Sequence, residues 1–329
     1  MPIPGELVFV IILALAFEFI NGSQSSGNIV ATMISSRAFS PRLALGMTAL
    51  AEFSAPFIFG SLVARTFGGG IVDAQSITLR ILIACLLGAI SWNAVNWLLG
   101  IPSSSTHSLL GGLMGSTLAA TGAHAIHFAR LNVILLGLLA TPVISFIAGF
   151  LVLRSVYFLA RHSTPGINEF FRRSQAVTAL SLAFSYGAND AQKTIGIITL
   201  GLVVSGALQE FAVPRWVILI SISATAMGTL FGGWRSIRTI GGKFFKIRPV
   251  HGLTTQLTSA AVILGASLAG LPASTSQVVS SAIMGVGASE RFGKVRWGVA
   301  GDILTAWVVT IPISALFGAG AYWLTARFP

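Results

Sequence analysis

Charged residues are scarce in this chain of 329 residues. They make up 9% of the sequence, against about a quarter in soluble domains, while hydrophobic residues make up 54%. No Asp, Glu, Lys or Arg occurs from residue 81 to 129, and residues 131–153 form a second uncharged run of 23. At about 1.5 Å per helical residue, such a run crosses a hydrocarbon core of about 30 Å. A water-soluble fold is therefore excluded, and the composition predicts an all-α polytopic membrane protein.

Cysteine is almost absent. Cys85 is the only one and lies in an apolar run, which excludes a disulfide framework. The five histidines are scattered, and only His124 and His127 lie near each other. Nothing resembles a nucleophile–base pair or a metal-ligand cluster, so we expect neither an enzyme nor a bound cofactor. The apolar residues 7–17 follow no basic region, and Glu18 precedes any small-residue cleavage site, so we expect a retained membrane span and not a signal peptide.

The net charge of +11 comes from basic residues that gather at the ends of apolar segments. The positive-inside rule places such clusters in cytoplasmic loops, so we interpret them as topology signals and lipid headgroup contacts, and not as a nucleic-acid interface. The clusters are Arg154, Arg161, Arg172 and Arg173; Arg235, Arg238, Lys243, Lys246 and Arg248; and Arg291, Lys294 and Arg296.

One motif occurs twice. Residues 100–116 read GIPSSSTHSLLGGLMGS and residues 270–286 read GLPASTSQVVSSAIMGV, at an offset of 170 that is close to half the chain. A second echo pairs RTFGG at 65–69 with RTIGG at 238–242. The repetition indicates two fused copies of one unit.

Equivalent loops of the two copies differ in charge. The basic loops 235–248 and 291–296 correspond to 65–80 and 122–130 in the first copy, which hold few basic residues. The equivalent loops then fall on opposite sides of the membrane. This predicts two inverted-topology repeats with both termini outside the cell.

The repeat also predicts the domain organisation. We expect a first membrane repeat over 1–160, a cytoplasmic linker over 161–175 and a second membrane repeat over 176–329. About 10–12 membrane segments are expected. Their number depends on whether 81–122 and 251–290 cross fully or re-enter as hairpins of broken helices.

Hydroxyl side chains dominate the repeated motif, at 103–107 (SSSTH) and 274–277 (STSQ). Pro102 and Pro272 precede these runs, and proline is favoured in the first turn of a helix. The hydroxyls then share a helix N-terminus with free backbone N–H groups, which together form an anion site. Ser and Thr can instead bond their own helix backbone. The doubling beside a proline favours a tetrahedral oxyanion site near the midplane of a transporter.

Ionisable residues inside apolar segments are costly and mark functional sites. Asp190 and Lys193 are three residues apart, so on a helix they share a face. We interpret Asn189 and Asp190 as oxygen ligands for a coupling cation, with Lys193 supporting the anion or Asp190; a purely structural ion pair is the alternative. Glu18 is a candidate cation ligand or proton carrier, and His107 a candidate donor to the anion. The remaining candidates, Glu52 and Asp302, are as well explained by structural roles.

Several motifs of the chain occur together in order: 100–107 (GIPSSSTH), 187–196 (GANDAQKTIG), His251 and Gly252 with Gln256, 270–277 (GLPASTSQ) and 284–287 (MGVG). Together they resemble the inorganic phosphate transporter (PiT) family of cation-coupled symporters. The resemblance covers nearly the full chain and is to the prokaryotic low-affinity phosphate permease type. It implies a helical membrane protein of two inverted repeats, a homodimer in the cell membrane, that carries phosphate with Na⁺ or H⁺ by alternating access.

The resemblance and the polar pattern together assign two sets of residues. We expect phosphate to contact Ser104, Ser105, Thr106, Ser274, Thr275, Ser276, Asn28, Gln277 and Lys193. We expect the coupling cation to contact Asn21, Gln24, Ser25, Asn189, Asp190 and Glu18.

Three positions depart from the family pattern. Ser25 stands where the motif NGxxDxAN carries an acidic residue, Gln277 where the second hydroxyl run carries His, and Tyr186 where His is frequent before GAND. The missing carboxylate removes a hard anionic ligand, so the coupling ion and its stoichiometry stay open. A permease for sulfate or another tetrahedral oxyanion is the alternative substrate assignment, and a passive anion channel is the alternative class.

Overall fold

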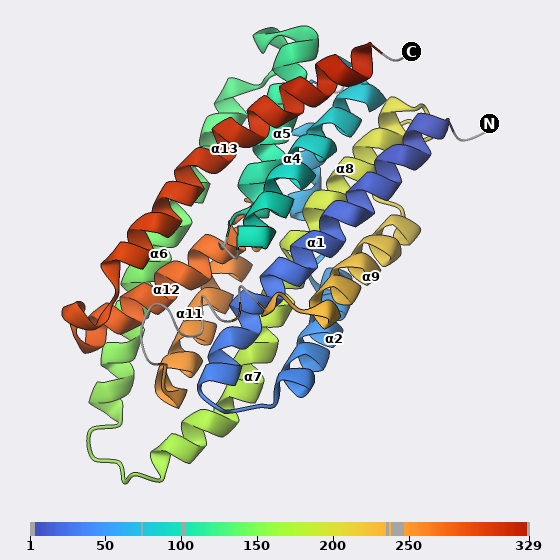
Figure 1. The fold of residues 1–329 in the computed structure, drawn as a ribbon. Coiled ribbons are helices and arrows are strands. Elements are labelled where there is room, and N and C mark those ends of the chain that lie inside the picture. The colour runs from blue at the N-terminus through green and yellow to red at the C-terminus, as the bar shows by residue number, and fades with distance from the viewer. Residues whose placement is uncertain (1–3, 74, 100–102, 235–236, 238–246, 328–329) are drawn as a thin grey trace.

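The computed structural model describes residues 4–73, 75–99, 103–234, 237 and 247–327. Over these residues the chain folds into α-helices and two short 3₁₀ turns, without a β-strand (Figure 1). The predicted all-α class is confirmed. Some sequence features lie outside the described residues: Gly100, Pro102, Arg235, Arg238, Lys243, Lys246 and the 238–242 echo.

The described helices follow one another along the chain as two similar series. The first is α1 (Gly5–Ser35), α2 (Pro41–Phe59), α3 (Leu62–Gly69), α4 (Leu79–Leu99), α5 (Ser105–Thr121), the 3₁₀ turn η1 (Ala123–Ala125) and α6 (Phe128–Leu159). The second is α7 (Ile167–Gly187), α8 (Asp190–Val204), α9 (Arg215–Phe231), α11 (Pro249–Leu268), α12 (Thr275–Glu290), the 3₁₀ turn η2 (Phe292–Lys294) and α13 (Trp297–Ala326).

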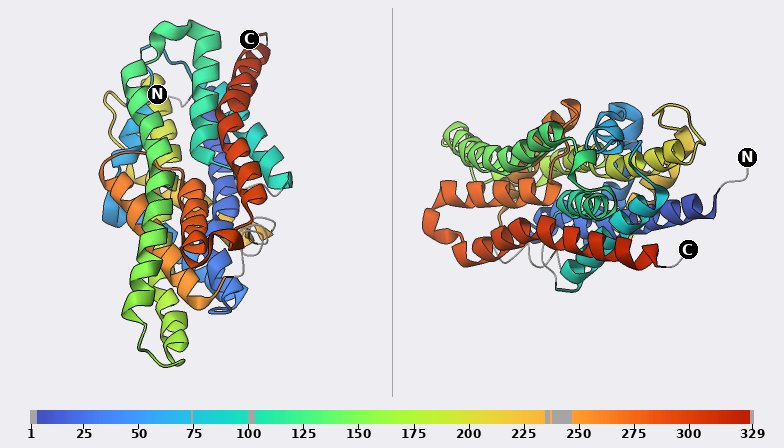
Figure 2. Two further views of the ribbon diagram at one scale, coloured as in Figure 1. Left: turned by 90° about the vertical axis from the view of Figure 1, so that its left-hand side faces the viewer. Right: turned by 90° about the horizontal axis from the view of Figure 1, so that it is seen from above.

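The bundle is elongated, and α1, α6 and α13 run along its length (Figures 1 and 2). The start of α1 and the end of α13 lie at the same end of the bundle. Five of the described helices, α1, α2, α4, α6 and α13, are long and apolar enough to cross a membrane. Side chains such as Leu139 on α6 and Val308 on α13 are 68% and 75% exposed, as suits a surface that faces lipid. This supports a multi-pass membrane protein, and the number of crossings stays a prediction.

Packing between the two series occurs in exchanged pairs. Helix α5 packs against α13 and α12 against α6, while α1 packs against α9 and α7 against α2. The repeated glycines Gly115 and Gly285 occupy equivalent positions in the α5–α13 and α12–α6 contacts. A Cβ at Gly115 would collide with the Ala315 carbonyl of α13, and one at Gly285 with the Phe146 carbonyl of α6. Both positions therefore need glycine for the close approach of two helices.

The polar segment 21–28 does not interrupt α1, which continues through it. The hydroxyls of Ser25 and Ser26 donate to the carbonyls of Asn21 and Ser23, so the helix satisfies these polar groups itself. Residues 167–175, the last part of the expected linker, form the first turns of α7.

The polar residues are set between two apolar clusters. Helix α1 places Leu7 and Phe17 in one cluster and Ile29 and Met33 in the other, with its polar segment between them. The second series does break here, because α7 ends at Gly187 and α8 begins at Asp190. The middle of the bundle is therefore where buried polar side chains gather.

Candidate functional site

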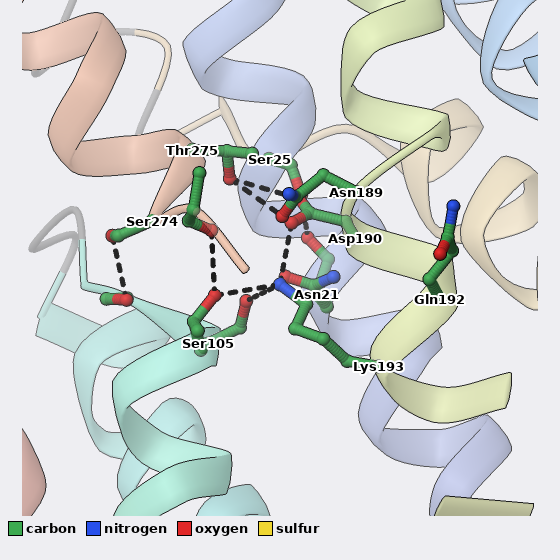
Figure 3. A network of polar contacts seen from close by, with 12 residues as sticks. Asn21, Ser25, Ser105, Asn189, Asp190, Gln192, Lys193, Ser274 and Thr275 are labelled. Carbon is green, nitrogen blue, oxygen red and sulfur yellow. Dashed lines mark hydrogen bonds and ion pairs between the residues drawn. The ribbon is translucent and has the colours of Figure 1, made fainter. Parts of the chain in front are cut away.

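The two hydroxyl runs meet in the middle of the bundle. Ser104 is the N-cap of α5 and Ser274 the N-cap of α12, as the sequence predicted for helix N-termini. The Ser274 hydroxyl donates to the Ser104 hydroxyl across 2.8 Å (Figure 3). Two helix N-termini, each with free backbone N–H groups and a positive dipole end, therefore converge on one place.

Each run is held in position by further hydrogen bonds. The backbone N–H of His107 donates to the Ser104 hydroxyl at 3.2 Å, and the Nδ1 atom of the same ring lies 2.6 Å from it. The Thr106 hydroxyl donates to the Ala273 carbonyl at 3.1 Å. The second contact ties the start of α5 to the residue before the α12 cap. Two hydrogen bonds, Ser274 to Ser104 and Thr106 to Ala273, therefore join the start of α5 in the first half of the chain to the start of α12 in the second.

A buried ion pair lies against both tips. Lys193 Nζ is 2.6 Å from Asp190 Oδ1, and both side chains are almost fully buried. The same ammonium donates to the hydroxyls of Thr106 at 3.0 Å and Ser105 at 3.2 Å. The hydroxyl of Thr275 on α12 donates to Asp190 Oδ2 at 3.1 Å. The pair therefore links the first turn of α8 to the N-termini of both α5 and α12 (Figure 3).

Two further carboxylates lie deep in the bundle. Glu18 accepts hydrogen bonds from Thr194 at 2.5 Å, Thr225 at 2.8 Å and Asn21 at 3.3 Å. Glu52 accepts one from Thr229 at 2.6 Å. Neither carboxylate has an ion pair with a basic side chain within the described part of the chain.

Most of the predicted residues border this network, in different ways. The Asn28 amide donates to the Ser276 hydroxyl at 2.9 Å, which joins α1 to α12. Asn189 lies against the loop before α12; in the orientation that satisfies its neighbours, its amide nitrogen donates to the Ala273 carbonyl at 3.0 Å and its oxygen accepts from Ser267 at 3.0 Å. Gln24 points elsewhere, because its amide donates to the Asn93 carbonyl.

Gln277 lines a cavity beside the site. Together with His107 it borders a volume of about 630 Å³ whose other walls are mainly apolar side chains of α6 and α13. Gln277 and His107 are each the third residue of their helix, α12 and α5. The third position of both helices therefore borders this mainly apolar cavity, while the residues that meet in the network are Ser104, Ser105, Thr106, Ser274 and Thr275.

Tyr186 adds a further polar group beside the site. Its side chain is completely buried on the last turn of α7, and the polar neighbours of its hydroxyl are the side chains of Thr275 and Asn28. It therefore belongs to the same buried polar region as the two hydroxyl runs.

Threonines of otherwise apolar helices escaped the sequence analysis. Thr194, Thr225 and Thr229 hold the two glutamates, and Asn93 accepts from the Ser108 hydroxyl at 2.7 Å. A single threonine in an apolar helix has no distinguishing pattern, because most such hydroxyls bond their own backbone. The Thr225 hydroxyl lies within hydrogen-bonding distance of both the Glu18 carboxylate and the Ser221 carbonyl of its own helix, and these two acceptors share its single proton.

Comparisons with known proteins agree with one another. A sequence model described as "Phosphate transporter family" matches residues 21–166 and 158–318. The chain is 42% identical over 322 residues to a probable low-affinity inorganic phosphate transporter of Bacillus subtilis (strain 168), covering 96% of each chain. It is also 42% identical to a protein of the same description from Rhizobium meliloti (strain 1021), over 96% of this chain and 95% of the other.

A solved structure is similar as well. It is described as "The sodium-dependent phosphate transporter", and it superposes with a TM-score of 0.91 over 99% of this chain and 100% of the other, at 23% sequence identity. At this identity the similarity shows a shared fold.

Proposed function

The chain belongs to the phosphate transporter family, and on this premise we propose that it carries inorganic phosphate across the cell membrane together with a cation. The expectation that it is not an enzyme is confirmed, because its relatives are named as transporters. Transport proceeds by alternating access around the meeting point of the two hydroxyl runs. The observation that carries the proposal is the contact of Ser274 with Ser104 beside the Asp190–Lys193 pair.

Phosphate suits the chemistry of this place. The site offers many hydrogen-bond donors. They come from two helix N-termini, from the Lys193 ammonium and from the hydroxyls of Ser104, Ser105, Thr106, Ser274 and Thr275. A tetrahedral oxyanion needs donors on several sides, with little fixed charge so that it can leave again. Hydroxyls of Ser and Thr can rotate to suit the bound anion.

The Asp190 carboxylate favours phosphate over sulfate. Near neutral pH phosphate carries a proton that it can donate to a carboxylate oxygen, whereas sulfate has none. A carboxylate beside sulfate would add repulsion without a hydrogen bond. Sulfate remains the alternative substrate that the experiment below must exclude.

For the coupling ion, Na⁺ has the more direct support. The protein with the similar solved structure is described as sodium-dependent, and in this chain Glu18 with the hydroxyls of Thr194 and Thr225 supplies hard oxygen ligands. Proton coupling uses the same carboxylates differently, since a buried Glu18 or Glu52 can carry a proton when it is neutral. Asn21 and Ser25 lie on the same face as Glu18, one and two turns along α1, and complete the proposed cation region.

An inverted repeat explains how the site can open to either side. The exchanged packing of α5 with α13 and of α12 with α6 is the pattern expected if two copies are related by a pseudo-twofold axis. In this proposal residues 1–160 and 176–329 are the two copies, the 161–175 segment joins them in the cytoplasm, and the hairpins α4–α5 and α11–α12 re-enter from opposite faces. Both chain ends are then outside, and two chains form a dimer.

Gradient-driven uptake tests the proposal. Purified protein in liposomes is given radiolabelled phosphate with an inward Na⁺ gradient, an inward H⁺ gradient or neither, each with and without excess unlabelled sulfate. We expect a cation gradient to drive phosphate uptake above the equilibrium level. Excess unlabelled sulfate should not remove this uptake. Accumulation of labelled sulfate instead would reassign the substrate, and uptake that never exceeds equilibrium would indicate a channel.

A further inference from the structure

We propose that the Lys193 ammonium is a tethered cation that occupies one cation position of the phosphate site. The protein then needs one mobile cation fewer to bind phosphate than it would with a neutral residue at position 193. This inference rests on the proposed function and goes beyond it, because it assigns part of the coupling charge to the chain itself.

The contacts of Lys193 match those of a bound monovalent cation. Its Nζ atom has three N–H donors, and three oxygen atoms surround it: Asp190 Oδ1 at 2.6 Å, Thr106 Oγ1 at 3.0 Å and Ser105 Oγ at 3.2 Å. A carboxylate and two hydroxyls are also the hard oxygen ligands that bind small cations. The side chain is 0% exposed, so bulk solvent contributes none of these contacts.

The charge balance of the buried region gives this position its importance. Among the described residues, the fully buried carboxylates are Glu18, Glu52 and Asp190, and Lys193 is the single buried Lys or Arg. A buried charge without compensation costs several kcal/mol. The carboxylates of this region already need Lys193, a bound cation or a proton to neutralise them. Phosphate adds further negative charge, so its binding must bring cations with it, protons included. Removing the Lys193 charge increases that requirement by one.

The Lys193 ammonium can attract phosphate electrostatically, and it is not released with phosphate because it is covalently part of the chain. It bridges α8 to the first turn of α5, while its partner Asp190 accepts a hydrogen bond from Thr275 of α12. A mobile cation at this position would leave with phosphate on each cycle. The tethered one does not, so it contributes attraction for the anion without contributing to the number of cations transported.

The number of cations that bind with phosphate can be measured without transport. Equilibrium dialysis gives the Kd of radiolabelled phosphate for the purified full chain as a function of Na⁺ at fixed pH and of pH at fixed Na⁺. The slope of log Kd against the log of each cation concentration counts the cations taken up with phosphate. The sum of the two slopes, corrected for the ionisation of phosphate itself, is the quantity to compare between variants.

Lys193→Met removes the charge and keeps a long unbranched side chain, and Lys193→Arg keeps the charge. We expect the summed slope to increase by one in Lys193→Met, so that each tenfold dilution of the cation weakens phosphate binding tenfold more than in the wild type. Lys193→Arg should keep the wild-type slope. Lys193→Gln, which retains a hydrogen-bond donor, gives the same comparison if the methionine variant does not fold.

The outcomes separate this inference from the proposed function. An unchanged slope in both neutral variants would overturn the tethered-cation role, as would a folded neutral variant that binds no phosphate at any cation concentration. In either case phosphate binding by the wild type leaves the proposed function standing. A wild-type protein that binds no phosphate would instead overturn the proposed function, and this inference with it.

Discussion

The hydroxyl of Ser274 donates to the hydroxyl of Ser104 across 2.8 Å, although 170 positions separate the two residues in the chain. They are the N-caps of α12 and α5, and hold the same place in the repeated motif. The contact joins equivalent points of the two halves, so any movement of one half against the other changes the surroundings of a solute bound there. The proposed alternating-access mechanism relies on this contact.

Asp190→Asn should abolish most transport. The substitution removes the carboxylate that pairs with Lys193 and accepts from Thr275. Breaking one partner of a buried pair leaves an uncompensated charge, at a cost of about 3–5 kcal/mol. We expect gradient-driven phosphate uptake to fall by about a hundredfold or more. The matched control is Asp302→Asn, on the exposed surface of α13, which should transport like the wild type. Equal uptake by the two variants would remove Asp190 from the mechanism.

Replacement of the repeated glycines should lower stability. The Cβ of Gly115→Ala or Gly285→Ala would collide with a backbone carbonyl of α13 or α6, and a helix backbone cannot move as a flexible side chain does. Overpacking of this kind costs about 1–3 kcal/mol. Thermal unfolding in detergent should show a lower Tm for both variants. Gly301→Ala is the control, because no atom lies within 4 Å of its added Cβ. If all three variants melt alike, the glycines do not set the helix contacts.

The local chemistry of the site and a shared place for its two hydroxyl runs could be predicted, and the individual contacts between the two halves could not. The hydroxyl runs were expected at helix N-termini, and Ser104 and Ser274 are indeed N-caps, because proline and hydroxyl preferences act over a few residues. The contact between the two caps depends on how the halves pack, which is not a local property. The roles of Thr194 and Thr225 depend on packing in the same way.

The polar segment of α1 is helical throughout. Its glycine, serine and asparagine residues have low helix propensity, but Ser25 and Ser26 satisfy their hydroxyls on the preceding turn. Sequence alone cannot distinguish a polar break from a helix whose hydroxyls bond its own backbone. Gln277 borders a mainly apolar cavity together with His107, because the third residue of a helix faces another direction than the first, and its predicted contact with the anion stays a prediction.

Glu18→Gln should weaken activation by the coupling cation. The change removes the negative charge but preserves the size of a side chain that Thr194 and Thr225 hold in place. We expect the cation concentration for half-maximal phosphate uptake to rise by about tenfold, the effect of losing one charged ligand contact of about 1.4 kcal/mol. The exposed Glu6→Gln at the start of α1 should leave the activation curve in place. Overlapping curves for the two variants would exclude Glu18 as a cation ligand.

Stability should depend on acid through Glu290 at the end of α12. Burial opposes its ionisation, yet the hydrogen bond from Lys294, the charge of His251 and the hydrogen bond from Tyr157 lower the pKa of Glu290 to about 2. A carboxyl whose pKa is lower in the folded state stabilises the fold above its unfolded pKa of about 4.5, and this stabilisation disappears as the pH falls toward 2.

The comparison of Glu290→Gln with the wild type measures this effect. We expect the variant to melt at a lower temperature at pH 7 and the difference to shrink between pH 4.5 and pH 2.5, since protonation gives the wild type a neutral side chain too. The stabilisation should be modest, because Lys294 and Arg248 are 45% and 61% exposed. A difference in Tm that stays constant across this pH range would contradict the assigned ion pairs.

The most direct test of the central claim is phosphate binding to purified Thr275→Val. This isosteric change removes the hydroxyl that donates to Asp190 at the tip of α12 and leaves every charge in place. If phosphate binds where the two hydroxyl runs meet, its Kd should rise by about tenfold or more, the value of a hydrogen bond to a charged group. Thr305→Val, an exposed position on α13, should bind phosphate like the wild type. Identical phosphate affinity in wild type, Thr275→Val and Thr305→Val would contradict the account.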